Sequence, residues 1–145
     1  MPTHAPVTVK VEVPVALTEA WLYFTSPEHI VEWNFASTDW WCPFADSYLR
    51  VDGRFKYRME AREGGMGFDF AGTFTHIEPE KRLEYLLDDG RKVKVQFADK
   101  NGLVTIVEDF EPENTNSLEL QQFGWQAILN NFATYAIQTF TSKND

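Results

Sequence analysis

The last long stretch of the chain, residues 117–141, reads SLELQQFGWQAILNNFATYAIQTFT. Its apolar residues fall on one stripe at helical spacing, which predicts a long amphipathic α-helix. That stripe consists of Trp125, Ile128, Leu129, Phe132, Ala136 and Phe140. Ser117 is the expected N-cap, because its hydroxyl can accept a hydrogen bond from a free backbone N–H group of the first turn. A helix of this length needs a broad apolar surface to cover.

Alternating sequences upstream supply that surface. Residues 7–13 alternate valine with polar residues, as in a half-buried strand. About six further strands are predicted in succession, at residues 48–51, 54–60, 68–76, 83–87, 93–97 and 103–110. The turn signals between them are Asp52-Gly53, Gly64-Gly65, Asp89-Gly90 and Asn101-Gly102.

Two short helices are predicted between the first strand and the others. Thr18 is the expected N-cap of a helix at 19–24, and Ser26 caps a second helix from 27 to about 33, with proline at its first position. Residues 34–47 combine turn formers with large aromatic side chains, and we interpret them as an ordered loop.

This order of elements predicts an α+β fold of the helix-grip type, in which a curved antiparallel sheet of about six to seven strands closes around the C-terminal helix. We assign residues 1–145 to one domain, with residues 1–6 as a frayed leader, because no linker, repeat or low-complexity tract divides the chain. A bent sheet around one helix leaves a space between them, and that space is the natural site for a small molecule.

The composition narrows the classes of function. Lys and Arg number 13 against 22 Asp and Glu, so the formal net charge is −9. An acidic surface disfavours binding to nucleic acid and to anionic membranes. The single cysteine, Cys42, cannot form an internal disulfide, and the sequence shows neither a secretion signal nor an apolar run long enough to span a bilayer. We therefore expect a cytoplasmic protein with no nucleic-acid or membrane partner.

Motifs typical of catalysis and metal binding are missing from the sequence. It has no Gly-x-Ser-x-Gly, no phosphate-binding glycine loop and no His-Glu-x-x-His. The three histidines lie far apart, and Cys42 has no cysteine partner, so we expect neither a metal site nor a cofactor. These observations favour a binding protein over an enzyme.

Two titratable residues share the phase of apolar neighbours on their strands. His76 is either a polar contact or proton acceptor at one end of the cavity, or a strand-end histidine bonded to backbone or water. Glu108 has the phase of Ile106 and Phe110. It either points into the cavity, where it needs a partner or a raised pKa, or is solvated at a bulge or strand end.

Three further positions allow more than one interpretation. Trp40 and Trp41 either fill the open end of the space between the sheet and the C-terminal helix or form a lid that opens for a ligand. Gly124 indicates close approach of the sheet, room for a ligand or a looser helix start. Cys42 lacks an adjacent base and is expected to be a buried, inert thiol.

Several short motifs carry a resemblance to a known family. They are FTSPEHI at 24–30 with Trp33, DWWCP at 39–43, VDGRF at 51–55, MGFDF at 66–70 with Gly72 and Thr73, and Gly124-Trp125. With them the chain resembles the START-like (SRPBCC) superfamily over about residues 7–140. Within it, the chain is most similar to bacterial-type proteins named after the activator of the heat-shock protein 90 ATPase, a group that includes polyketide-cyclase-like proteins. The resemblance implies the helix-grip fold, on which lipid carriers, hormone receptors, cyclases and dioxygenase domains are all built.

We therefore expect a small, largely apolar or amphipathic molecule to bind between the sheet and the last helix. The predicted ligand-binding residues are Trp40, Trp41, Phe55, Tyr57, Phe68, Phe70, Phe74, His76, Val95, Ile106, Glu108, Trp125, Leu129 and Phe132. One alternative is a cyclase- or hydrolase-like enzyme with His76 or Glu108 as its general acid or base. Another is a co-chaperone-like activator of a chaperone ATPase, and the chain is expected to be a monomer or a homodimer.

Overall fold

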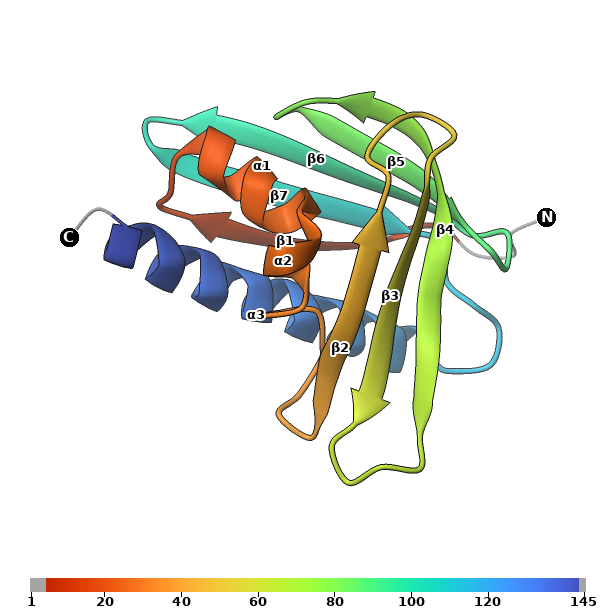
Figure 1. Cartoon of the computed structure of the whole chain (residues 1–145). Coiled ribbons are helices and arrows are strands. Elements are labelled where there is room, and N and C mark those ends of the chain that lie inside the picture. The colour runs from red at the N-terminus through yellow and green to blue at the C-terminus, as the bar shows by residue number, and fades with distance from the viewer. Residues whose placement is uncertain (1–4, 144–145) are drawn as a thin grey trace.

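The structure is a computed structural model that describes residues 5–143, so the first four residues of the predicted leader lie outside it. The described residues form seven strands and three helices, which Figure 1 labels. In chain order they are β1 (Val7–Val13), α1 (Leu17–Thr25), α2 (Pro27–Ile30), β2 (Trp40–Ser47), β3 (Arg54–Ala61), β4 (Gly67–Glu78), β5 (Arg82–Leu87), β6 (Lys92–Lys100), β7 (Leu103–Phe110) and α3 (Leu118–Lys143).

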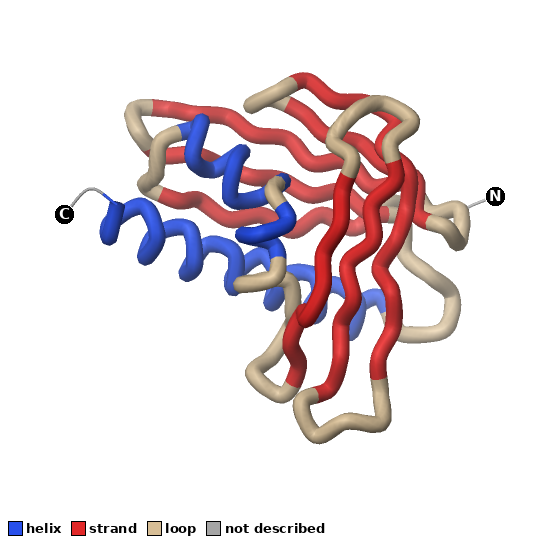
Figure 2. The backbone as a smooth tube through the Cα atoms, in the orientation of Figure 1, coloured by secondary structure: helices blue, strands red, loops and turns tan. Residues whose placement is uncertain are grey.

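All seven strands form one antiparallel sheet in the order β1-β7-β6-β5-β4-β3-β2. Strands β2 to β7 follow one another as hairpins, and β1 returns to pair with β7, so that β1 and β2 are the two edges. The sheet curls strongly, and the three helices lie on its concave side (Figures 1 and 2). The predicted helix-grip fold is therefore confirmed.

Edge strand β2 differs from the prediction. Residues 34–47 were expected to form a loop, but Trp40–Ser47 is strand β2, and the predicted strand at 48–51 is instead the connection to β3. Pro43 lies where the pairing of β2 with β3 shifts register, between Trp41 and Phe44. Since an edge strand pairs on one side, proline can be placed there without losing a sheet hydrogen bond. This is why a turn-like sequence forms a strand.

A side-chain cap is present at the start of α3 but not at the starts of α1 and α2. Ser117 caps α3 as predicted, because the backbone N–H group of Leu120 donates to its hydroxyl at 3.1 Å. The prediction for Thr18 is wrong: α1 begins at Leu17, and the Thr18 hydroxyl donates to a Glu80 carboxylate oxygen at 3.2 Å. The second helix ends at Ile30 and is shorter than expected.

The core is dense around the middle of α3. Leu129, Phe132 and Ala136 are buried there, and the Phe132 ring lies 5.3 Å from that of Phe24 and 5.0 Å from that of Trp33. Nearer its N-terminal end the helix instead borders a cavity, through Gln121, Trp125 and Ile128. Among the helices within residues 5–143, none has both the length and the hydropathy that a membrane crossing requires.

Candidate functional site

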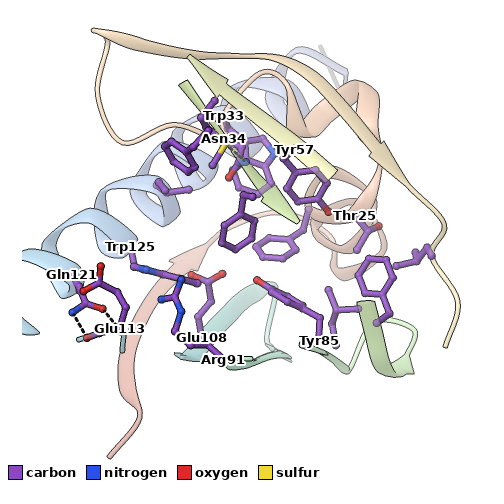
Figure 3. Close-up of a pocket in the computed structure, with 18 of the residues that line it drawn as sticks. Thr25, Trp33, Asn34, Tyr57, Tyr85, Arg91, Glu108, Glu113, Gln121 and Trp125 are labelled. Atoms are coloured by element: carbon purple, nitrogen blue, oxygen red, sulfur yellow. Dashed lines mark hydrogen bonds between the residues drawn. The ribbon is translucent and has the colours of Figure 1, made fainter. Parts of the chain in front are cut away.

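A cavity of about 280 Å³ lies between the concave face of the sheet and the N-terminal half of α3 (Figure 3). Residues of β3, β4, β5 and β7 form one wall, and residues of α1, α3 and the connecting loops complete it. The lining residues are Phe24, Thr25, Trp33, Asn34, Leu49, Tyr57, Met59, Phe68, Phe70, Phe74, Leu83, Tyr85, Arg91, Glu108, Glu113, Asn116, Gln121, Trp125 and Ile128.

Six of the predicted ligand-binding residues line this cavity: Tyr57, Phe68, Phe70, Phe74, Glu108 and Trp125. They come from four different elements, and the alternation along β3, β4 and β7 places them on the inner face. The sequence therefore identified much of the aromatic wall. Whether these residues bind a ligand stays a prediction.

Five other predicted residues belong to the packed core and do not line the cavity: Phe55, Val95, Ile106, Leu129 and Phe132. They have the predicted inward phase, but neighbouring side chains cover them. The Phe55 ring, for example, lies 5.0 Å from the rings of both Tyr57 and Tyr85. These residues belong to the core that supports the cavity wall.

The two adjacent tryptophans also lie away from the cavity lining. Both belong to edge strand β2, where the Trp40 ring lies 5.9 Å from the ring of Phe68, and Trp41 is 41% exposed. Trp40 therefore packs behind a lining residue. Cys42, between them and Pro43, is buried as predicted, and burial raises the pKa of its thiol.

His76 lies on the outer face of the sheet and does not line the cavity, contrary to its expected phase. The physical reason is a β-bulge in β4. Phe74 pairs with Tyr85, and His76 pairs with Glu84, so Thr75 is an extra residue that inverts the alternation beyond it. The His76 Nε2 atom lies 3.0 Å from Arg82 and 3.2 Å from Glu78, in a half-exposed charged group.

Glu108 is the buried carboxylate of the cavity, and its predicted inward phase is confirmed. Its side chain projects from β7 into the same space as the Tyr85 hydroxyl, which comes from β5 (Figure 3). Glu108 is 7% exposed, and within residues 5–143 its carboxyl group forms no hydrogen bond or ion pair. Burial raises its pKa to about 8. Near neutral pH this group can therefore both hold and release a proton.

Aromatic rings line the cavity together with Glu108. Phe110, two residues along the same strand, stacks on Trp125 of α3 with ring centroids 4.1 Å apart. The Phe70 ring lies 5.8 Å from that of Trp125 and 6.3 Å from that of Tyr85. Burial, and then the nearby Glu108 charge, raises the pKa of the Tyr85 hydroxyl well above its ordinary value. The carboxyl group thus lies in an apolar, aromatic surrounding.

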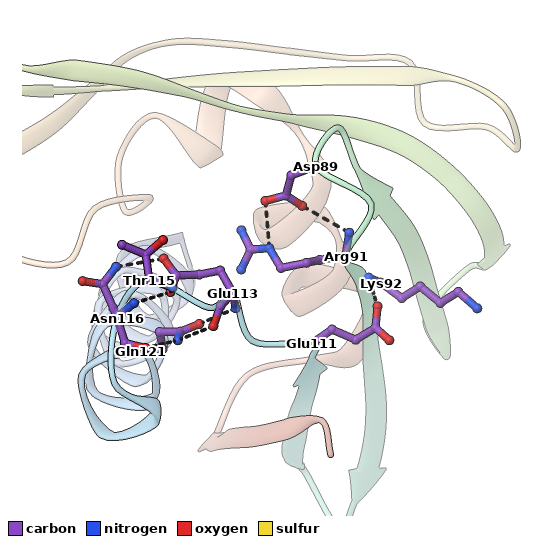
Figure 4. A network of polar contacts seen from close by, with 8 residues as sticks. All are labelled: Asp89, Arg91, Lys92, Glu111, Glu113, Thr115, Asn116 and Gln121. Carbon is purple, nitrogen blue, oxygen red and sulfur yellow. Dashed lines mark hydrogen bonds and ion pairs between the residues drawn. The ribbon is translucent and has the colours of Figure 1, made fainter. Parts of the chain in front are cut away.

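A group of polar residues lines one end of the cavity, and the sequence analysis missed it. We call Arg91, Glu113, Asn116 and Gln121 the polar rim (Figures 3 and 4). Gln121 is 8% exposed and ties the loop before α3 to the helix: its amide donates to the backbone carbonyls of Glu113 (3.1 Å) and Asn116 (2.9 Å). Its own Oε1 atom accepts from the backbone N–H of Glu113 at 2.8 Å.

The charges of the polar rim already have partners. Arg91 Nε donates to Asp89 at 2.9 Å. The Glu113 carboxylate accepts from the backbone N–H groups of Thr115 (3.0 Å) and Asn116 (2.6 Å), and these bonds hold its pKa below the ordinary value. A polar run at residues 113–117 directly before a predicted helix was the available signal for this rim.

Two further observations concern metal-binding groups and the space around Gly124. Over residues 5–143, His, Cys, Asp and Glu side chains do not gather in groups of three that could hold a metal ion. A Cβ atom built on Gly124 would meet no atom within 4 Å, so the sheet does not approach the helix closely at this glycine. The interpretation of Gly124 as a close-approach position is therefore wrong.

Comparisons with known proteins agree with this fold. The family model described as Activator of Hsp90 ATPase homolog 1-like protein matches residues 14–136. The chain is similar to the solution structure of an AHSA1-like protein from Aeromonas hydrophila, with 38% identity and a TM-score of 0.83 over 92% of this chain and 94% of the other. It is also similar to a protein from Cytophaga hutchinsonii, with 41% identity and a TM-score of 0.79 over 96% and 93% of the two chains. A comparison with curated proteins found no match.

Proposed function

We propose a function from the premise that this chain belongs to the family of Activator of Hsp90 ATPase homolog 1-like proteins in the SRPBCC superfamily. The proposed function is that of a cytoplasmic protein that binds a small, largely apolar molecule between the sheet and α3. The observation that carries the proposal is the cavity of about 280 Å³ with aromatic walls and a buried carboxyl group that has no partner among the described residues. Ligand sites commonly combine such apolar walls with a few polar groups that orient the ligand.

The size and lining of the cavity suit a compact ligand. Typical ligand pockets have volumes of about 300–1,000 Å³, and this cavity of about 280 Å³ lies just below that range. Burial of apolar ligand surface contributes about 25 cal/mol per Å² and would supply most of the affinity. Leu49, Phe68 and Asn116 line the cavity and are also exposed, so the site reaches the protein surface beside them.

Displacement of a fluorescent dye tests the proposal. The neutral dye N-phenylnaphthylamine is expected to bind with increased fluorescence, and native mass spectrometry of the same protein is expected to show a bound small molecule. Ile128→Trp, which fills the cavity, should abolish dye binding, whereas Phe123→Trp on the 74% exposed position of the same helix should leave it unchanged. Equal dye binding by both variants, or no binding by the unmodified protein, would contradict the proposal.

An enzymatic role in the same cavity is a second candidate, and the raised pKa of Glu108 favours it. A carboxyl group with a pKa of about 8 can act as a general acid or base near neutral pH. His76 lies outside the cavity, so Glu108 alone would serve in that role. Should a turnover be found, Glu108→Gln is expected to reduce kcat by about 10²-fold or more, and an unchanged kcat would eliminate this assignment.

Stimulation of a chaperone ATPase is a third hypothesis. Its support is the name of the matching family model, which refers to activation of Hsp90 ATPase. A chaperone ATPase assay with saturating amounts of this protein tests it directly. An unchanged ATPase rate would contradict this hypothesis.

A further inference from the structure

We infer that the molecule bound in the cavity carries a protonated amine on an apolar or aromatic body, and that Glu108 binds the amine (Figure 3). This inference rests on the proposed function and names the chemical class of its ligand. It is carried by three observations on the described residues: the unsatisfied carboxyl group, the rings around it and the balance of charges along the cavity wall.

The first observation is the lack of a protein partner for Glu108. A buried ionised carboxylate is costly unless it is paired and hydrogen-bonded, and a polar group left unpaired at 7% exposure needs a compensating contact. Across the described part of the chain, no cation or hydrogen-bond donor contacts this carboxyl group. A ligand that donates hydrogen bonds and brings a positive charge would supply the missing partner.

The second observation is the set of rings that faces the same space. Phe70, Tyr85 and Trp125 all line the cavity beside Glu108, and Phe70 lies within 6.3 Å, between ring centroids, of both other rings. Aromatic faces attract cations through their quadrupole, most strongly when water is excluded. Rings around a carboxylate therefore favour an organic ammonium group over a neutral hydroxyl or carbonyl.

The third observation is the charge of the lining. When Glu108 is ionised, the charged lining residues are two carboxylates, Glu108 and Glu113, and one guanidinium, Arg91. Arg91 already donates to Asp89, outside the lining, so its charge is partly compensated. The formal net charge of the whole chain is −9. A carboxylate or sulfonate ligand would meet an unfavourable potential at Glu108, whereas a cation would be attracted.

The ionisation of Glu108 gives this inference a pH signature. The titratable groups that line the cavity with it are Tyr85 from β5, Tyr57 from β3, and Arg91 and Glu113 of the polar rim. Trp125, which lines the cavity from α3, does not titrate. With the Glu108 pKa at about 8, an ammonium ligand must bind the minor, ionised form below that pH. Its affinity should therefore fall about tenfold for each pH unit below 8, because fewer molecules hold an ionised carboxylate.

Three probes of similar shape test the inference: phenylbutylamine, phenylbutanol and phenylbutyrate. We expect the dissociation constants, from displacement of N-phenylnaphthylamine at pH 8, to rank the amine tightest and the carboxylate weakest. Glu108→Gln should weaken the amine by about tenfold or more and remove its pH dependence, with little effect on the alcohol. Asp109→Asn is the matched control, since it removes the same charge from the next residue, whose side chain pairs with Thr8 and Lys94.

The outcomes separate this inference from the proposed function. If the dye and the alcohol bind but the amine binds no tighter than the alcohol, the cavity is a ligand site and the amine assignment is wrong. Tightest binding of phenylbutyrate would also overturn it, and would indicate Arg91 as the group that holds an anionic head. If none of the probes and no dye binds, the proposed function itself fails.

Discussion

Burial of the Glu108 carboxyl group among aromatic rings costs folding free energy, because the charged form loses its hydration without gaining a protein partner. Apolar residues at this position would pack with no such cost. Residues kept at the expense of stability are often functional, since a binding site needs polar groups left unsatisfied until the ligand arrives. The cost should therefore be measurable as a pH-dependent loss of stability.

We predict that Glu108→Gln stabilises the protein at neutral and alkaline pH. The ordinary pKa of a glutamate is 4.5 and that of Glu108 in the fold is about 8, so the folded state holds the proton more tightly than the unfolded state. The contribution of this group to the free energy of unfolding is fully present below pH 4.5. It decreases by about 1.4 kcal/mol per pH unit as the pH rises toward 8. The variant should thus gain roughly 3 kcal/mol in the free energy of unfolding at pH 7.

Urea denaturation at pH 5, 7 and 8 measures this gain. The difference between the variant and the unmodified protein should be small at pH 5 and grow with pH, while Asp109→Asn should show no such trend. A constant difference across the three pH values would mean that Glu108 is not held in its protonated form by the fold.

At the scale of single elements, the sequence predicted phase well wherever a strand is regular. Tyr57, Phe70 and Glu108 face inward as their alternation indicated. The same rule placed His76 inside, because nothing in the sequence around Thr75 marks the bulge that inverts the phase. Strand β2 was missed for a related reason: Pro43 reads as a loop former, and its edge position is a property of the assembled sheet.

The long helix allows a matched pair of substitutions. Phe132 is fully buried and Phe123 is 74% exposed on the same helix. We predict that Phe132→Ala destabilises the protein by about 3–5 kcal/mol, through lost burial and the cavity it leaves, and that Phe123→Ala changes stability by less than about 0.5 kcal/mol. Chemical denaturation of both variants measures these effects. Similar losses for the two variants would contradict the placement of the helix on the sheet.

At the scale of the whole molecule, the order of elements predicted the fold, since one long helix was the available cover for a curved sheet. The position of the cavity was harder to predict. It depends on how α3 diverges from β3, β4 and β5, and on the polar rim, which joins Arg91 before β6 to Gln121 at the start of α3. Such contacts between distant segments arise from the tertiary structure, and alternation or helical spacing along the chain does not encode them.

This geometry makes the N-terminal half of α3 the part of the fold that a ligand should stabilise most. Residues 118–120 and 122–123 are exposed, whereas Leu129, Phe132 and Ala136 are anchored in the core. Segments with few buried contacts open more readily than the core. A molecule in the cavity would add contacts to Trp125 and Ile128 of α3 and to Phe70 on the inner face of β4.

We therefore predict that saturation with N-phenylnaphthylamine slows amide hydrogen exchange chiefly in residues 118–128 and in β4. Residues 132–143 should change less, because their packing does not depend on the cavity. Exchange followed by mass spectrometry of peptides measures the difference, and Ile128→Trp should reproduce the protection without the dye by filling the same space. Protection spread evenly over all peptides would contradict binding in the cavity and would indicate that the dye binds elsewhere. Global stabilisation alone would also give a different pattern, because it slows exchange most in the core.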